Sequence, residues 1–447
     1  DGVRDLLGQR VAQLRRSSVQ ALEIASVLGR EFDLATLASL NRVVDDELVA
    51  YLEGAIRAGL IRPDPKHAGR YAFTHALVRQ KLYGDLGTTR RVRLHWSVGL
   101  ALQAADFDDV DAVAYHLTEG VLAGDTGMAV DATLAAGARA LQMSAFETAL
   151  DHFENALMLL DQGESADSER RYAALVGLGD AHVALSNVAG YTGAFLAAAE
   201  VARAEGRADR LARVALGIGT HALIVRLAPE TAALFDEAID ALGPDDSIER
   251  SMLLSYRAFH RAVTPGLAED RHAEIDEAAA IAFRVGDRRA VAQATFARAS
   301  ALRGSPLVDE MVELADALRE TAVELDDVML QTQAHLIGGT AHLQRGDRAE
   351  WQRAAEGLRL LARRASGAYA RPWSCLWDTI ELVLDERYID AEHNASAGAG
   401  SWNTHPIVEL SFRSQQWSLL RWRGRDGAGA DLVRPWVDSP GTASMRA

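Results

Sequence analysis

Apolar residues change their spacing within one stretch of the chain, from Tyr71 to Tyr83. Tyr71 and Phe73 lie two residues apart, as on one face of a strand. From Leu77 onward the apolar positions recur at three- and four-residue steps, as on a helix. The pattern predicts a strand that runs directly into a helix. Thr74 lies at the joint and is the expected N-cap, because its hydroxyl can accept a hydrogen bond from the first helical turn.

The residues before this stretch show helical spacing first and strand spacing later. Helical spacing predicts two helices before residue 30, a short helix over 34–40 and another helix from Asp45. Short strands are then expected at 59–62 and 70–73, on either side of a turn that contains Pro and Gly. Three helices followed by a strand pair are typical of a winged helix.

Two more helices, from His75 and from about Thr89, complete a winged-helix-like domain with extra helices over residues 1–105. His75 is expected in the first turn of its helix. There the free backbone N–H groups and the positive end of the helix dipole can hold an anion such as a phosphate. From the residues alone, the alternative is a core histidine bonded to a neighbouring backbone group.

From residue 106 onward the strand pattern ends, and Ala-rich helical segments alternate with Gly, Asp and Pro breaks. Gly137 is followed by Ala149, Phe153 and Ala156, which is the spacing of small and large residues in a tetratricopeptide repeat. The same small-to-small interval links Gly179 to Ala198 and Gly219 to Ala238, each with a Phe three residues before its end.

This spacing has a physical reason, because a small residue lets two helices approach while an aromatic ring fills the groove beside them. One helix pair cannot bury its apolar face alone, so neighbouring pairs stack and leave a concave surface. We therefore predict a mainly α protein, with a tetratricopeptide-like repeat superhelix over 106–438 and a disordered tail at 439–447.

Three glycine-containing segments resemble phosphate-binding loops but are better explained by packing between helices. They are Gly177–Asp180, Gly217–Thr220 and Gly338–Thr340, and none of them follows a predicted strand. The small and Gly-rich segment 395–401 is predicted to be a loop.

The charge of the chain is uneven. The net charge is −16, with a balance of +4 in residues 1–104 and −20 in the remainder. Nucleic acid is therefore an improbable main partner, and any basic surface belongs to the first domain.

Lysine usage excludes one class of enzyme. Lys66 and Lys81 are the only lysines, and neither lies in a Gly-Lys-Ser/Thr sequence. The chain therefore has no phosphate-binding loop of the ATPase type, and we expect it to be neither an enzyme nor a binder of any cofactor by itself. His335 and His342 can share a helix face, but no further ligand stands at zinc-site spacing, so no metal site is expected.

The cysteine content and the lengths of the apolar runs indicate the cellular compartment. Cys375 is the only cysteine, which excludes an intrachain disulfide and suits a reducing cytoplasm. No apolar run is long enough to cross a bilayer, and no membrane partner is expected. Because the sequence does not begin with Met, we expect it to be part of a longer protein.

Several segments of the first hundred residues resemble one protein family. The segments are Val27-Leu28-Gly29-Arg30-Glu31-Phe32-Asp33, Ala58-Gly59-Leu60-Ile61, Tyr71-Ala72-Phe73-Thr74-His75-Ala76-Leu77-Val78-Arg79, Leu82-Tyr83 and Arg93-Leu94-His95. They look like the winged-helix part of bacterial signal-transduction ATPases with numerous domains, in particular the large LuxR-type regulators and the adenylate-cyclase-linked ATPases of actinobacteria.

The resemblance implies an arrangement of domains and a role for His75. In such proteins a nucleotide-binding domain precedes the winged helix, and tetratricopeptide-like repeats follow it as the sensor. His75 falls where the winged helix contributes a histidine to the β-phosphate of ADP, with Thr74 beside it. ATP or ADP would then be a cofactor of the full-length protein only.

We therefore expect a regulatory and sensor module. Its winged helix would respond to the nucleotide state of a nucleotide-binding domain in the same protein, and its repeats would bind a small-molecule or protein signal. Two alternatives remain open. One is a DNA-binding winged helix that uses Arg15, Arg16, Arg90, Arg91 and Arg93. The other is a plain repeat scaffold.

Overall fold

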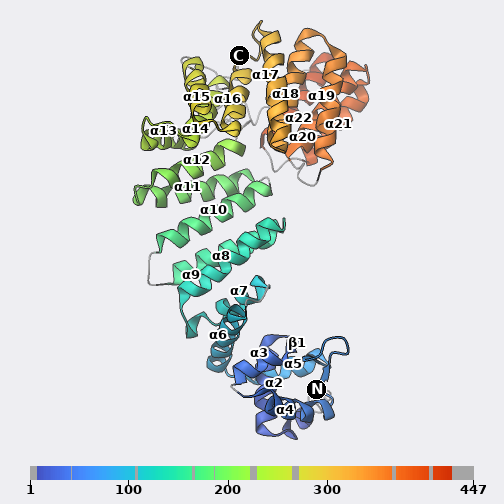
Figure 1. Ribbon diagram of the computed structural model, residues 1–447. Coiled ribbons are helices and arrows are strands. Elements are labelled where there is room, and N and C mark those ends of the chain that lie inside the picture. Colours follow the sequence, from blue (N-terminus) through green and yellow to red (C-terminus); the bar gives the residue numbers. More distant parts are fainter. Residues whose placement is uncertain are drawn as a thin grey trace. The chain divides into compact units, whose positions relative to one another are not determined.

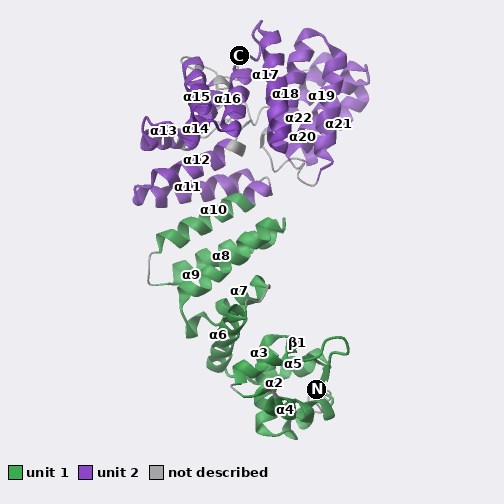
Figure 2. Cartoon of the chain, in the orientation of Figure 1, with its two compact units in different colours: residues 1–181 green, residues 182–447 purple. Residues whose placement is uncertain are grey.

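The computed structural model describes residues 8–41, 43–105, 109–163, 167–185, 187–221, 229–263, 271–364, 369–401 and 406–424. The chain divides into two compact units, residues 1–181 and 182–447 (Figure 2). The predicted tail at 439–447 lies outside the described residues.

The first unit begins with helices around a small antiparallel sheet (Figure 1). The three strands have the order β1-β3-β2, so the last strand in the sequence lies in the middle. Buried apolar residues of the helices and strands form one core, which includes Leu22, Leu52 and Phe73. These elements are α2 (Arg16–Leu28), β1 (Glu31–Asp33), α3 (Leu34–Asn41), α4 (Asp45–Arg57), β2 (Ile61–Pro63), β3 (Arg70–Phe73), α5 (Ala76–Asp85) and α6 (Thr88–Ala104).

The predicted strand pair is confirmed by β2 and β3, whereas β1 was not predicted. Its central residue, Phe32, lies opposite Tyr71 in the sheet, and its ring stacks on the Tyr71 ring at a centroid distance of 6.0 Å. A strand of three residues is too short to show the period-two alternation that identifies strands in a sequence.

The rest of the first unit consists of stacked helices. One apolar core runs through it, from Val27 and Leu86 to Leu117 and Ala174, and therefore passes the predicted limit at residue 105. The predicted limits 1–105 and 106–438 stay predictions. The further elements are α7 (Val110–Glu119), the 3₁₀ helix η1 (Val121–Ala123), α8 (Thr126–Gln142), α9 (Phe146–Gln162) and α10 (Ser168–Ala184), and the division between the two units falls within α10.

The second unit is a tetratricopeptide-like α-solenoid in which consecutive helices pack against each other. Its helices are α11 (Val188–Ala204), α12 (Ala208–His221), α13 (Pro229–Leu242), α14 (Ile248–Val263), α15 (Arg271–Val285), α16 (Arg288–Ala301), α17 (Val308–Glu324), α18 (Val328–Arg345), α19 (Arg348–Ala362), α20 (Ala370–Leu384), α21 (Tyr388–Ser401) and α22 (Pro406–Trp422).

The helices of the second unit form two rows. Helices α12, α14, α16, α18, α20 and α22, here called the inner row, also contact one another along the stack. Helices α13, α15, α17, α19 and α21, the outer row, have their main contacts with inner-row neighbours. Because the shorter distances along a curved stack are on its concave side, the inner row lines the concave surface.

Short turns with acidic caps separate the repeats. Asp287 and Asp347 each accept a hydrogen bond from a backbone N–H three residues later, which satisfies the first turn of α16 and of α19. Each follows a glycine with a positive φ, 73° at Gly286 and 76° at Gly346. The two turns agree with the Gly and Asp breaks that were expected between the helical segments.

The small residues of the repeat pattern lie against aromatic rings, as predicted. A Cβ atom added at Gly137 would approach the Phe153 ring to 2.9 Å, and one added at Gly177 would approach the same ring to 2.3 Å. At Gly339 the added atom would come to 2.1 Å from the Trp377 ring. No side chain fits at these positions, so the glycines serve helix packing.

The prediction of a loop at 395–401 is wrong, because these residues belong to α21. Ala395 is fully buried, and a Cβ atom at Gly398 would lie 2.2 Å from the ring of Phe412 on α22. The small residues allow close packing of α21 on α22, and this gain outweighs the low helix propensity of glycine.

In the described residues, no helix combines the length and apolar character that a membrane span needs. The same residues contain no group of three or more His, Cys, Asp or Glu side chains placed to hold a metal ion.

Candidate functional site

His75 lies at the N-terminus of α5, one residue from its predicted place. It is the N-cap residue itself, with the extended backbone angles φ −137° and ψ 138°, and α5 begins at Ala76. The side chain is exposed and does not cap the helix. The alternative of a core histidine is therefore wrong, while the predicted phosphate contact stays a prediction.

Thr74 is not the N-cap, in contrast to the prediction. Its hydroxyl donates to the backbone oxygens of Gly59 and Leu60, at 2.7 and 3.0 Å, and its N–H donates to the Leu60 oxygen at 3.0 Å. These bonds fix the end of β3 to the residues just before β2. Thr74 therefore holds the junction that carries His75, and its hydroxyl proton is already in use.

Two of the five arginines named for DNA binding have partners inside the first unit. Arg90 forms an ion pair with Glu23 at 2.6 Å. Arg91 donates to the Leu86 oxygen at 3.1 Å, and its guanidinium lies 4.8 Å from the centre of the Tyr83 ring. Arg15, Arg16 and Arg93 are exposed.

A polar cavity of about 330 Å³ lies between α17, α18 and α19. His335 and His342 both line it, so the predicted shared face is confirmed. The charged residues around it form local pairs, Asp316 with Arg319 and Glu350 with Arg353. Burial, with a smaller effect of the Arg319 charge, lowers the pKa of His335 to about 4. This cavity presents a neutral imidazole and charges that already have partners.

A second group of polar side chains comes from the inner row and from α11. Arg303 follows Leu302, the C-cap residue of α16, and is exposed. The protein atoms crowded around its guanidinium nevertheless lower its pKa, an effect that Tyr369 partly offsets. In the part of the chain that the structure describes, Arg303 has no ion-pair partner.

Tyr369 is the N-cap residue of α20 and is half-buried. Burial raises its pKa, whereas a hydrogen bond from the Gln333 side chain and the positive charge of Arg303 lower it.

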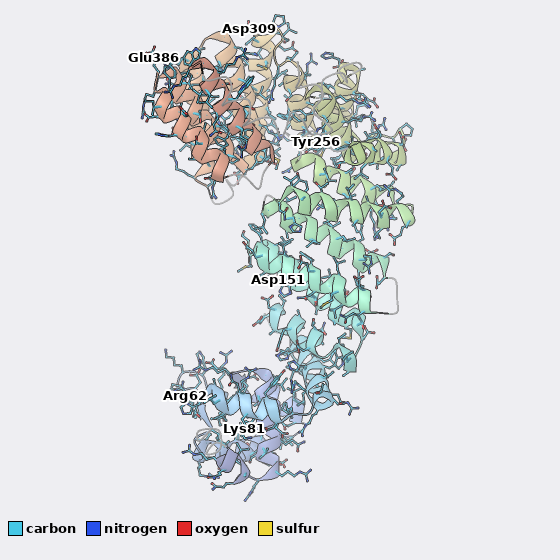
Figure 3. All side chains as sticks on the ribbon, turned by 180° about the vertical axis from the view of Figure 1, so that it is seen from behind. Arg62, Lys81, Asp151, Tyr256, Asp309 and Glu386 are labelled. Atoms are coloured by element: carbon cyan, nitrogen blue, oxygen red, sulfur yellow. The ribbon has the colours of Figure 1, made fainter. Side chains whose placement is uncertain are left out.

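Gln333 is 1% exposed, and its Oε1 has no hydrogen-bond partner among the described residues. Tyr256 of α14, labelled in Figure 3, and Tyr191 of α11 also act electrostatically on Tyr369. The name inner cluster is used here for Tyr369 and the residues that act electrostatically on it, which come from five parts of the second unit: Tyr191, Tyr256, Arg303, Gln333 and Tyr369.

The inner cluster was not predicted from the sequence. Its members are separated by up to several repeats and share no motif, because stacking of the helices brings them together. The one available signal was the position of Arg303 outside an apolar stripe, which is shared by many surface arginines.

No protein-family model matches the chain, and no curated protein matches it. Among solved structures, the chain is similar to a signal transduction ATPase with numerous domains that has a tetratricopeptide repeat sensor, from Pyrococcus horikoshii. The match has a TM-score of 0.37 and 11% identity, and it covers 94% of this chain and 66% of that one. The chain thus spans just under two thirds of that protein.

A second similar structure is a Rap protein complexed with Competence and Sporulation Factor. Its TM-score is 0.41 at 13% identity, with 95% of this chain and 99% of that chain covered. Both similarities concern the helical repeat architecture and are too low for the transfer of a function.

Proposed function

We propose that the chain is the sensor and interaction part of a cytoplasmic bacterial signalling ATPase or LuxR-type regulator, and that the inner row of the second unit binds a peptide or an extended segment of a partner protein. The observation that carries this proposal is the inner cluster. Polar and aromatic side chains of several inner-row helices gather there, and the accessible guanidinium of Arg303 has no ion-pair partner in the described residues.

Packing alone does not account for such a cluster. The cores of the repeats are formed by Ala, Leu, Phe and Trp, as at Trp351, Leu358 and Phe412. An arginine that has no carboxylate partner among the described residues is a group that a ligand can use. Extended peptides suit such a surface, because they can contact several repeats at once.

For the first unit, we propose a winged helix that acts as a nucleotide-state switch in a longer protein. The support is the resemblance of its motifs, the small sheet beside α3 and α4, and the exposure of His75 at the start of α5. The chain itself would then regulate rather than catalyse, and its partner would be the nucleotide-binding domain of the same protein.

The test is hydrogen–deuterium exchange of the full chain, with and without a pool of random hexapeptides that have free C-termini. We expect slower exchange in the inner-row helices α14, α16, α18 and α20, because a bound peptide covers them. Protection that is confined to the outer-row helices α15, α17 and α19, or no protection at all, would contradict the proposal.

A further inference from the structure

We propose that the groove between α20 and α22 binds a small organic acid with an apolar body and a single carboxylate, and that Arg421 pairs with the carboxylate. Helices α20 and α22 are neighbours in the inner row and contact each other directly (Figure 1). This inference goes beyond the peptide binding proposed above and does not depend on it.

The groove has a volume of about 790 Å³. Its lining includes aliphatic side chains of α20 and two indole rings of α22, namely Ile380, Val383, Leu384, Trp417 and Trp422. Pockets of about 300–1,000 Å³ with an apolar and aromatic lining and a few polar groups are typical binding sites of small organic molecules. The size and the lining of this groove therefore suit a small ligand with an apolar body.

The spacing of residues along α20 explains why its side of the groove carries no charge. Ile380 and Leu384 lie four residues apart and therefore share one face of the helix. Asp378 and Glu381 both pair with Arg359 of α19 instead, Asp378 at 2.9 Å. Helix α20 thus presents its carboxylates to an outer-row helix and its apolar side chains to the groove.

Arg421 is the one charged side chain among the described residues that line the groove. Its guanidinium carbon lies 5.5 Å from the centre of the Trp417 ring, which also lines the groove. Contact with the face of an aromatic ring holds a guanidinium in place without using its N–H donors. Arg421 is exposed and forms no ion pair within the described part of the chain. Its donors are therefore available to both oxygens of a carboxylate.

The position of Arg421 in the last turn of α22 offers a competing explanation, because the helix dipole stabilises a cation there. The dipole explains the charge but not the apolar surface beside it. The Trp422 side chain is 64% exposed, and its ring meets Tyr388 only edge-on, at a centroid distance of 4.5 Å. An exposed indole lacks the stabilisation that burial brings, and a ligand in the groove would supply it.

The charge at the groove favours a ligand with one carboxylate. A single guanidinium neutralises one carboxylate, whereas a phosphoryl group carries about 1.5–2 negative charges and is normally bound by several cations. The whole chain has a net charge of −16, so a groove whose lining holds a cation and no carboxylate differs from most of the surface. An amine would be repelled by Arg421, and a neutral ligand would leave the charge unpaired.

The experiment measures the fluorescence of dansyl-labelled undecanoate with the full chain, because dansyl fluorescence rises in an apolar site. The bound probe is then displaced with decanoate or with decanol, which have the same chain length but differ in charge. We expect decanoate to displace the probe at least about tenfold more effectively, since it forms hydrogen bonds between charged groups. Arg421→Gln should make the two competitors equal.

A second variant fills the groove without changing a charge. Ser418 lines the groove, is exposed and donates to the Ser414 oxygen at 2.9 Å. Ser418→Trp should weaken probe binding by at least about tenfold, because the indole occupies the apolar space that the ligand needs. The matched control is Ser401→Trp on α21, because Ser401 is also exposed and donates to the carbonyl four residues earlier, at 2.9 Å.

Arg345→Gln is the control for Arg421→Gln, because Arg345 is also exposed and lies in the last turn of an inner-row helix. Both control variants should bind the probe as the wild-type chain does. Circular dichroism melts confirm that every variant is folded.

Equal displacement by decanoate and decanol, unchanged in Arg421→Gln, would overturn the carboxylate contact. Probe binding that Ser418→Trp leaves intact, or no probe binding at all, would overturn the groove as the site. Displacement by random hexapeptides but not by decanoate would assign the groove to a peptide and contradict the acid. A dimer in analytical ultracentrifugation that Ser418→Trp dissociates would assign it to a second copy of the chain. The peptide binding proposed above is judged separately, from hydrogen exchange in α14, α16 and α18.

Discussion

The α-carbon of Gly339 faces the ring of Trp377, so the packing of α18 on α20 depends on the absence of a single methyl group. Gly339→Ala should destabilise the second unit by about 1–3 kcal/mol through overpacking. Gly193 in α11 is the control, because a Cβ atom there meets nothing within 4 Å. Gly193→Ala should stabilise by about 0.5–1 kcal/mol, since alanine is the better helix former. Urea unfolding of both variants tests this, and shifts of the same sign would contradict it.

The exposed ring of His75 leads to a prediction that rests on the proposed longer protein with a nucleotide-binding domain. His75→Ala should weaken ADP binding by roughly ten- to a hundredfold and raise basal activity, if the imidazole donates to a phosphate. His67, which is also exposed and lies in the turn between β2 and β3, is the matched control. The measurement is ADP dissociation from folded proteins. An unchanged rate in His75→Ala would exclude the phosphate contact.

At the scale of elements, α6 and α7 are joined by a buried pair of histidines. The Nδ1 atoms of His95 and His116 lie 3.0 Å apart, and Nε2 of His95 lies 3.0 Å from the Tyr83 hydroxyl. Burial, with smaller effects of neighbouring positive charges, lowers the pKa of each histidine to about 4. The N–H···N bond between the rings requires that at least one Nδ1 is unprotonated.

This pair predicts a loss of stability in acid. The unfolded chain takes up these protons near pH 6.5, whereas the folded chain takes them up only near pH 4. The contribution of this pair to the unfolding free energy is therefore fully present above about pH 7, and it is lost as the pH drops from 6.5 toward 4. His116→Gln should reduce the fall between pH 7.5 and 5.0 by on the order of 1 kcal/mol, measured by thermal unfolding. Exposed His67→Gln is the control, and an equal pH dependence in all three proteins would contradict the account.

The elements show how far the sequence predicts this structure. The helix packing was predictable, because each contact such as Gly137 on Phe153 repeats at a fixed interval along the chain. Strand β1 was missed because three residues are too few to show the alternation of a strand. The helix at 395–401 was missed because its glycines and alanines fit a loop as well as a helix until their packing partner Phe412 is known. The inner cluster was missed because tertiary stacking, rather than any local pattern, brings Arg303 and Tyr369 together.

For the whole molecule, we predict that the chain neither hydrolyses ATP nor binds it tightly. The sequence contains no lysine in a glycine-rich phosphate loop. The glycines that resemble such loops, as at Gly177 and Gly339, instead lie against aromatic rings of neighbouring helices. Isothermal titration calorimetry with ATP and Mg²⁺ checks this. Stoichiometric binding with a submicromolar Kd would contradict it.

The central claim is that the inner row, and not the outer row, receives a peptide. It is tested most directly by photocrosslinking with p-benzoylphenylalanine, placed either at Tyr369 in the inner cluster or at Phe283 on α15 of the outer row, which is 83% exposed. Both positions already carry an aromatic ring, so the two variants are comparable. With a biotinylated pool of random hexapeptides that have free C-termini, the account predicts adducts at position 369 and only background at position 283. Equal or stronger labelling at position 283, or none at either position, would contradict it.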